Sequence, residues 1–72
     1  MEITIRDEFI RLGQAMKLAG LVENGVEAKD VITEGKVSVN GETELRRGKK
    51  LRDGDSFTYG QQTVTVRAPR QD

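Results

Sequence analysis

The chain has 72 residues, of which 35% are hydrophobic and only three are aromatic, one Tyr and two Phe. A domain of this length buries only about 60% of the surface that its unfolded chain exposes, so its core is thin. We therefore expect a single domain over residues 1–72, with no deep cavity for a small-molecule substrate.

Cysteine and histidine are both absent. The lack of Cys excludes disulfides and thiolate metal sites, and the lack of His removes the commonest general base and metal ligand. Residues 1–72 show neither the pattern of a signal peptide nor a long apolar run. We expect a cytoplasmic protein without catalytic residues, metal, cofactor or membrane contact.

The 12 basic and 12 acidic residues give a net charge of zero, which taken alone argues mildly against nucleic acid. Their distribution is uneven. Residues 1–45 carry five basic and nine acidic side chains, whereas residues 46–72 carry seven basic and three acidic ones. This polarity predicts a basic surface built from the second part of the sequence.

The first elements follow from apolar periodicity. Residues 2–6 alternate between apolar and polar side chains, which predicts a half-buried strand. From Leu12 the spacing changes to i, i+3, i+4 and i+7, through Ala15 and Met16 to Ala19, which predicts a helix. Gly20 is typical of the residue that ends such a helix.

A second helix follows after a short connection. Asn24 and Glu27 form an extended capping-box pattern, and the stripe of Ala28 and Val31 leads to a closing Gly35. Two short helices joined by a few residues must pack as a hairpin.

The remaining sequence predicts short strands. Residues 36–39 alternate and run into Asn40-Gly41, a pair suited to a type I′ turn. Residues 42–52 are polar and basic, with Leu45 and Leu51 as apolar anchors. Further strands are expected at 56–59 and 63–67, before a polar tail at 69–72. The order indicates an α+β fold in which the helical hairpin packs on a small, mostly antiparallel sheet.

Further assignments concern the three aromatic side chains and a pair of aspartates. Phe9 and Phe57 are expected in the core, because so few large apolar groups are available, and Tyr59 is left open. Scarce aromatics favour recognition of structured RNA by shape and phosphate over the reading of unstacked bases. Asp53 and Asp55 flank a glycine turn, where Asp commonly bonds to backbone, so we expect no metal or acid–base site there.

A set of spaced motifs carries a family resemblance over residues 11–57. These are Arg11-Leu12, Ala19-Gly20-Leu21, Glu27-Ala28-Lys29 with Ile32, Gly35-Lys36-Val37-Ser38-Val39-Asn40-Gly41 and Gly54-Asp55. In this pattern the chain resembles the αL-motif RNA-binding domain of ribosomal protein S4. Leu12-Gly13-Gln14 and residues 46–51 are similar to its short stand-alone bacterial members, the YaaA and YbcJ type.

Two departures from the family pattern stand out. The family often has Ser-Arg at the start of the second helix, where this sequence has Asn24-Gly25, so the cap is kept and the arginine is lost. An Asp commonly follows Arg-Leu, and here it is Gly13.

The resemblance implies an RNA-binding module whose partner is structured RNA, ribosomal RNA or tRNA, with a role beside the ribosomal subunit in assembly or quality control. Phosphate binding needs closely spaced cations, and the basic run at 46–52 supplies them. Alternatively, these cations prevent an exposed strand edge from pairing with another chain. The expected RNA-binding residues are Arg11, Lys17, Lys29, Lys36, Asn40, Arg46, Arg47, Lys49, Lys50 and Arg52.

Two alternatives remain open. Residues 39–42 and 51–55 resemble segments of a sulfur-carrier β-grasp protein. Such carriers need a C-terminal Gly-Gly, whereas this sequence ends Pro69-Arg70-Gln71-Asp72. The second alternative is a protein–protein adaptor that binds its partner through the acidic residues of 1–45.

Overall fold

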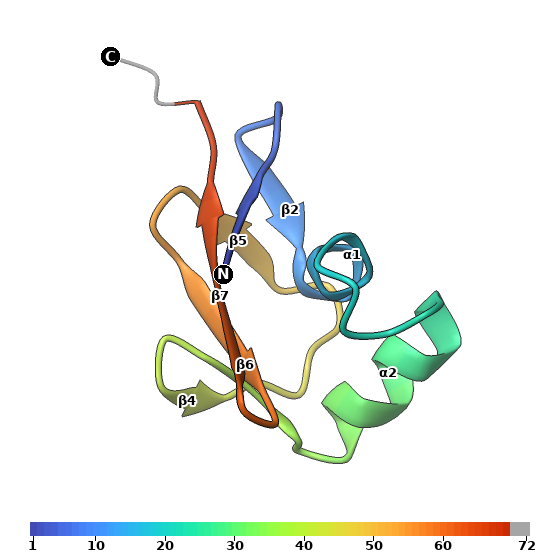
Figure 1. Ribbon diagram of the computed structural model, residues 1–72. Helices are drawn as coiled ribbons and strands as arrows, with labels where there is room; N and C mark the ends of the chain where they lie inside the picture. The colour runs from blue at the N-terminus through green and yellow to red at the C-terminus, as the bar shows by residue number, and fades with distance from the viewer. Residues whose placement is uncertain (70–72) are drawn as a thin grey trace.

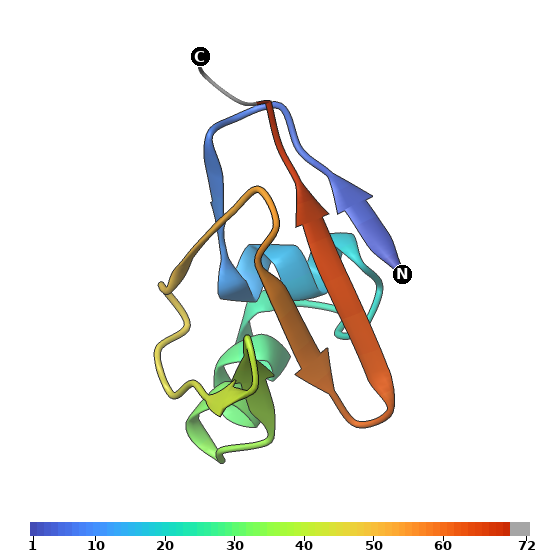
Figure 2. The ribbon, with the colours of Figure 1, turned by 90° about the vertical axis from the view of Figure 1, so that its left-hand side faces the viewer.

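The computed structural model describes residues 1–69, in which two helices lie on one side of a five-stranded sheet (Figures 1 and 2). In spatial order the sheet contains β1 (Glu2–Thr4), β7 (Gln62–Arg67), β6 (Ser56–Tyr59), β3 (Val37–Val39) and β4 (Glu42–Thr43). β1 pairs with β7 in parallel, and the other neighbours are antiparallel. A separate antiparallel ribbon joins β2 (Phe9–Arg11) to β5 (Lys50–Arg52). The predicted α+β fold is confirmed.

The helices α1 (Leu12–Leu18) and α2 (Gly25–Thr33) form the predicted hairpin. Past the end of α1, Gly20 has a φ of 78°, which a side chain with a Cβ rarely adopts. The N–H of Leu21 donates to the carbonyl of Met16 at 3.0 Å, and the N–H of Gly20 donates to that of Lys17 at 3.0 Å. This is a Schellman ending, and Gly35 closes α2 in the same way, so both predicted helix ends are confirmed.

The start of α2 carries the predicted cap in a modified form. Asn24 Oδ1 accepts a hydrogen bond from the N–H of Glu27 at 2.8 Å. The carboxylate of Glu27 reaches one residue beyond the cap and accepts from the N–H of Glu23 at 2.7 Å. The N–H of Glu27, which the helix itself leaves without a partner, is therefore satisfied, and so is the N–H of Glu23 before the cap.

The core lies between the helical hairpin and the sheet. Its largest fully buried side chains are Phe57, Leu12, Met16, Ile32, Leu51, Val37, Val64 and Val66. Burying one such side chain contributes about 1.5–3 kcal/mol relative to its exposure. The helical stripes read from the sequence and the prediction for Phe57 are confirmed.

One element of the remaining chain was not foreseen, and two predictions were wrong. The ribbon of β2 and β5 was not foreseen, because three-residue strands give too short an alternation to be recognised. Phe9 is half-buried on the outward face of β2 rather than in the core, because Ile10, opposite Leu51, takes the inward position. Leu45 is 57% exposed and anchors nothing, whereas Leu51 is fully buried as expected.

The predicted turn at Asn40-Gly41 is present. Both residues have positive φ, 50° and 87°, as a type I′ turn requires, and Val39 lies opposite Glu42 across the hairpin. Within residues 1–69, no helix has the length and apolar character needed to cross a membrane.

Candidate nucleic-acid interface

The start of α1 is hydrogen-bonded to the basic segment that leads into β5. The N–H of Leu12 donates to the carbonyl of Lys49 at 2.9 Å, and the N–H of Gly13 donates to that of Arg47 at 3.1 Å. The adjoining β2–β5 ladder continues this contact. The basic segment is thereby fixed beside the helical hairpin, as the resemblance implied.

A groove lies between this segment and the two helices, and we call it the basic groove. It has a volume of about 250 Å³ and is lined by Arg11, Gly13, Gln14, Lys17, Gly25 and Arg47. Three of these residues are cations, and all three are exposed. The guanidinium of Arg11 donates to the carbonyl of Gly48 at 3.0 Å, which ties the groove to the basic segment.

Arg47 reaches the groove by lying across Gly13. A Cβ placed on Gly13 would stand 2.7 Å from Arg47 Cγ and 3.2 Å from its Cδ, both closer than ordinary contact. Glycine at this position, where the family commonly has Asp, therefore leaves the space that the stem of Arg47 occupies.

Gly25, the first residue of α2, also lines the basic groove. A Cβ on Gly25 would meet no atom within 4 Å. This is the position of the family's second-helix arginine, so its loss leaves open space in the groove rather than a substitute contact.

Most of the predicted basic run faces a second, shallow depression, which we call the basic hollow. It has a volume of about 520 Å³ and is lined by Arg46, Gly48, Lys49, Lys50 and Arg52. The run is therefore divided, with Arg47 in the groove and its other four cations at the hollow. Gly48 joins the two depressions through its bond to Arg11.

Arg46 differs from its neighbours because it is paired with Glu44. Its Nε lies 3.0 Å from Glu44 Oε2 and its Nη2 donates to Oε1 at 3.3 Å, while its backbone N–H donates to Oε2 at 3.0 Å. These hydrogen bonds lower the pKa of Glu44, and the carboxylate in turn raises the pKa of Arg46. Part of the charge of Arg46 is thus neutralised within the protein.

Among residues 1–69, the other cations of the groove and the hollow form no ion pair. Over residues 1–69, the ion pairs join Lys36 to Glu34, Arg67 to Glu2 and Arg46 to Glu44. Within that range the six remaining cations of the two depressions form no ion pair: Arg11, Lys17, Arg47, Lys49, Lys50 and Arg52. Their charges are free to attract an external anion.

The outward face of the β2–β5 ribbon combines cations with an aromatic ring. The ammonium of Lys50 lies 4.7 Å from the centroid of the Phe9 ring, and the guanidinium carbons of Arg52 and Arg11 lie 5.6 Å and 5.8 Å from it. These separations are within the range of cation–π attraction.

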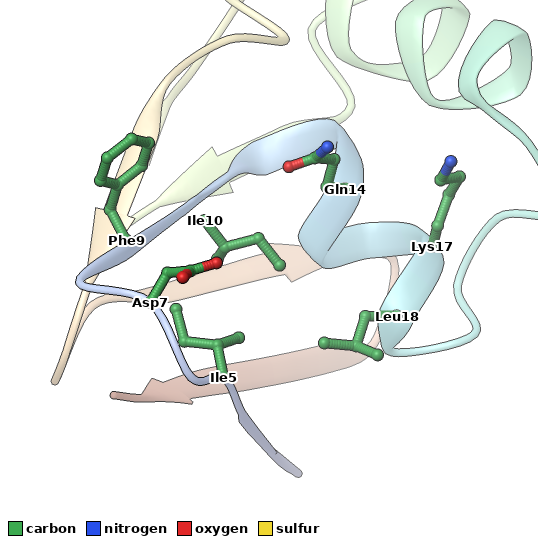
Figure 3. A pocket seen from close by; sticks show the side chains of 7 residues that line it. All are labelled: Ile5, Asp7, Phe9, Ile10, Gln14, Lys17 and Leu18. Carbon is green, nitrogen blue, oxygen red and sulfur yellow. The ribbon is translucent and has the colours of Figure 1, made fainter. Parts of the chain in front are cut away.

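An apolar hollow of about 570 Å³ borders this ribbon (Figure 3). It is lined by Ile5, Asp7, Phe9, Ile10, Gln14, Lys17 and Leu18. In Figure 3 the side chains of Ile5, Ile10 and Leu18 point toward one another, whereas the ring of Phe9 points away from them at the rim. Phe9 therefore lines the rim of this hollow, with its ring turned away from the three aliphatic side chains.

The structure does not bring every predicted residue to this surface. Lys29 and Lys36 are exposed but line neither the groove nor the basic hollow, and Lys36 is 3.1 Å from Glu34. The amide of Asn40 spans two neighbours, because Nδ2 donates to Asp55 at 3.1 Å and Oδ1 accepts from the N–H of Ser56 at 2.9 Å. Asn40 therefore holds its turn against β6.

The two aspartates at the glycine turn bond to backbone, as expected. Asp55 Oδ2 accepts from the N–H of Arg52 at 2.8 Å, and Asp53 Oδ1 accepts from the N–H of Ala68 at 2.9 Å. Among the residues that the structure describes, no group of three or more His, Cys, Asp or Glu side chains is placed to hold a metal ion.

The sequence did not predict the pairing of Glu44 with Arg46, the contact of Gly13 with Arg47 or the outward position of Phe9. Lys50-Leu51-Arg52 does show one apolar residue between two cations, but Phe9 and Ile10 are both apolar, so the sequence does not indicate which of them faces outward.

With this geometry in view, comparison with known proteins identifies the family. The model of the S4 domain family matches residues 3–67. The chain belongs to the S4 domain family. It is 47% identical over 53 residues to the probable ribosome maturation protein RlbA of Bacillus subtilis (strain 168), across 74% of this chain and 75% of that relative.

A second relative is the putative RNA-binding protein YbcJ of Escherichia coli (strain K12). It is 36% identical over 57 residues, which cover 79% of this chain and 81% of the relative. The solution structure of YbcJ from E. coli, described as revealing an αL motif involved in RNA binding, matches with a TM-score of 0.72 and 31% identity. That match covers 93% of this chain and 86% of the other. The predicted resemblance is confirmed.

Proposed function

We propose that this S4 domain protein binds structured RNA by its phosphate backbone across the basic groove and the basic hollow. The observation that carries the proposal is the gathering of six cations without ion-pair partners, within residues 1–69, on two adjoining depressions. Phosphates spaced along a backbone attract such cations and release their counterions on binding. The six residues assigned to this contact are Arg11, Lys17, Arg47, Lys49, Lys50 and Arg52.

The other candidates receive different roles in this proposal. Arg46 contributes less, because Glu44 already holds its guanidinium. Asn40 positions the turn rather than contacting RNA, because both ends of its amide are used within the fold. Lys29 and Lys36 add to the positive electrostatic potential but do not contact the RNA backbone.

The relatives support a ribosomal RNA as the partner. One is named a probable ribosome maturation protein and another a putative RNA-binding protein. We infer that this chain, as a single cytoplasmic domain over residues 1–72, binds ribosomal RNA during maturation of a ribosomal subunit and performs no catalysis. The alternatives of a sulfur carrier and of a protein adaptor have no such support from the relatives.

The experiment compares two triple variants of equal charge. One replaces Arg47, Lys49 and Lys50 with Gln, and the other replaces Lys29, Lys36 and Arg67 with Gln. Affinity for a ribosomal RNA hairpin is measured by fluorescence anisotropy at several salt concentrations. The logarithm of the parent's affinity should fall against log salt by roughly 0.7–0.9 for each phosphate contact.

The first variant should lose roughly two units or more of that slope, because three phosphate contacts are removed. The second variant should keep most of the parent's slope, because its cations lie away from the two depressions. Equal loss in both variants would mean that binding depends on net charge alone and that the assigned surface is wrong. An unchanged slope in the first variant would refute the site directly.

A further inference from the structure

Phe9 is a large aromatic residue that the fold places on a solvent-facing surface. In the β2–β5 ladder Phe9 lies opposite Arg52, and Arg11 lies opposite Lys50, so all four side chains share the outward face of the ribbon. The ring is half-buried, and it points away from the apolar side chains of the neighbouring hollow (Figure 3). The core does not require this ring, because Ile10 and Leu51 already fill the inward face.

Three cations surround this ring at centroid distances of 4.7, 5.6 and 5.8 Å. Over residues 1–69, Arg11, Lys50 and Arg52 have no acidic partner at ion-pair distance. The face therefore combines an aromatic surface with positive charge that the described part of the protein does not compensate. A ligand that matches both properties carries a π face and an anion a few bonds apart, and a nucleotide is such a ligand.

The position of the ring connects it to the phosphate-binding surface. Arg11 lines the basic groove, and Lys50 and Arg52 line the basic hollow. The guanidinium of Arg11 also bonds to Gly48, at the boundary of the two depressions. An RNA backbone lying across both depressions would therefore pass beside Phe9.

We propose that Phe9 is a stacking platform for one unpaired nucleobase of the bound RNA, with its adjacent phosphates held by Arg11, Lys50 and Arg52. This inference rests on the proposed function and names the RNA class, a helical element that carries a bulged or terminal unpaired nucleotide. The ammonium of Lys50, on a flexible stem, moves from the ring to a phosphate as the base takes its place. The sparse aromatics of the sequence are thus compatible with reading one base.

The test uses two RNA hairpins with the same stem, one fully paired and one with a single bulged adenine. Phe9→Leu keeps an apolar side chain and removes the π face. We expect the parent to bind the bulged hairpin more tightly. Phe9→Leu should weaken binding of that hairpin by roughly tenfold, as loss of one base–aromatic stack does, and leave binding of the paired hairpin unchanged.

Phe9→Trp provides an independent readout, because the chain contains no other Trp. It should retain the preference for the bulged hairpin, and its emission should be quenched more strongly by the bulged than by the paired hairpin. This spectroscopic change reports stacking even if Phe9→Leu proves unstable, which its thermal unfolding midpoint would show.

Failure of this inference is distinguishable from failure of the proposed function. If the parent binds both hairpins equally, or Phe9→Leu weakens both equally, Phe9 is not a base platform while phosphate binding still stands. Equal quenching of the Trp variant by both hairpins would overturn the platform as well. If neither hairpin binds the parent, the proposed function fails, and the stacking inference fails with it.

Discussion

The contact between Gly13 and Arg47 allows a substitution of one methyl group to test the basic groove. In Gly13→Ala the new Cβ would stand 2.7 Å from Arg47 Cγ, so that the stem must shift by about 0.7 Å to reach ordinary contact. Cγ is one bond from the Arg47 Cβ, and the shift therefore requires rotation about χ1, which carries the guanidinium out of the groove. Such an off-rotamer adjustment costs about 0.5–1.5 kcal/mol.

Stability should change little in Gly13→Ala. Alanine in a helix is favoured over glycine by about 0.5–1 kcal/mol, which offsets the strain on Arg47. RNA affinity should fall roughly fivefold, equivalent to about 1 kcal/mol, and the salt slope should fall by about 0.7–0.9, as expected when one phosphate contact is lost.

Gly25→Ala is the matched control, because it adds the same methyl group to another residue that lines the groove, at a position where nothing lies within 4 Å. It should leave affinity and salt slope unchanged. The assay is fluorescence anisotropy with a labelled ribosomal RNA hairpin, and the double variant Gly13→Ala with Arg47→Gln completes a thermodynamic cycle. If Gly13→Ala weakens binding as much in the Arg47→Gln background as in the parent, Gly13 does not act through Arg47 and the reasoning is refuted.

Two further predictions concern groups at the edge of this surface. Asn40→Ala removes the hydrogen bonds to Asp55 and Ser56 and puts alanine at a φ of 50°. The substitution should lower the free energy of unfolding by about 1–2 kcal/mol and the melting midpoint in calorimetry by about 5–10 °C. RNA affinity at 10 °C should be unchanged, and a loss of affinity without a loss of stability would instead make Asn40 a contact residue. Because hydrogen bonds from Arg46 lower the pKa of Glu44, the stability that this pair supplies is present at neutral pH and lost as pH falls through the lowered pKa. An NMR titration of the carboxyl carbon should show the pKa of Glu44 rising in Arg46→Gln, and an unchanged value would contradict the pairing.

The elements set by local signals were predictable from the sequence. Gly20 and Gly35 end their helices where the apolar stripes stop, and Asn24 caps the second helix with its own side chain. The turn at Asn40-Gly41 depends on two residues that tolerate positive φ. These features involve residues within a few positions of each other, so short windows of sequence contain the necessary information.

The ribbon of β2 and β5 was not predictable in the same way. It joins Phe9 to Arg52 across more than forty residues, and neither strand has enough residues to show its own periodicity. The outward position of Phe9 and the lining of the groove by Arg47 both follow from that pairing. For the same reason, the sequence could not predict how the basic run is divided between groove and hollow. The pairing of Arg46 with Glu44 was also seen only in the structure.

The most direct test of RNA binding at this surface is an NMR titration of the ¹⁵N-labelled protein with a ribosomal RNA hairpin. Our proposal predicts that the largest amide shifts fall on residues 11–17 and 46–52 and on Gly25, all around the two depressions. Amides of Lys29, Lys36 and the turn at 60–61 should remain nearly unchanged. Shifts centred on Lys29 and Lys36, with residues 46–52 unaffected, would contradict the proposed interface.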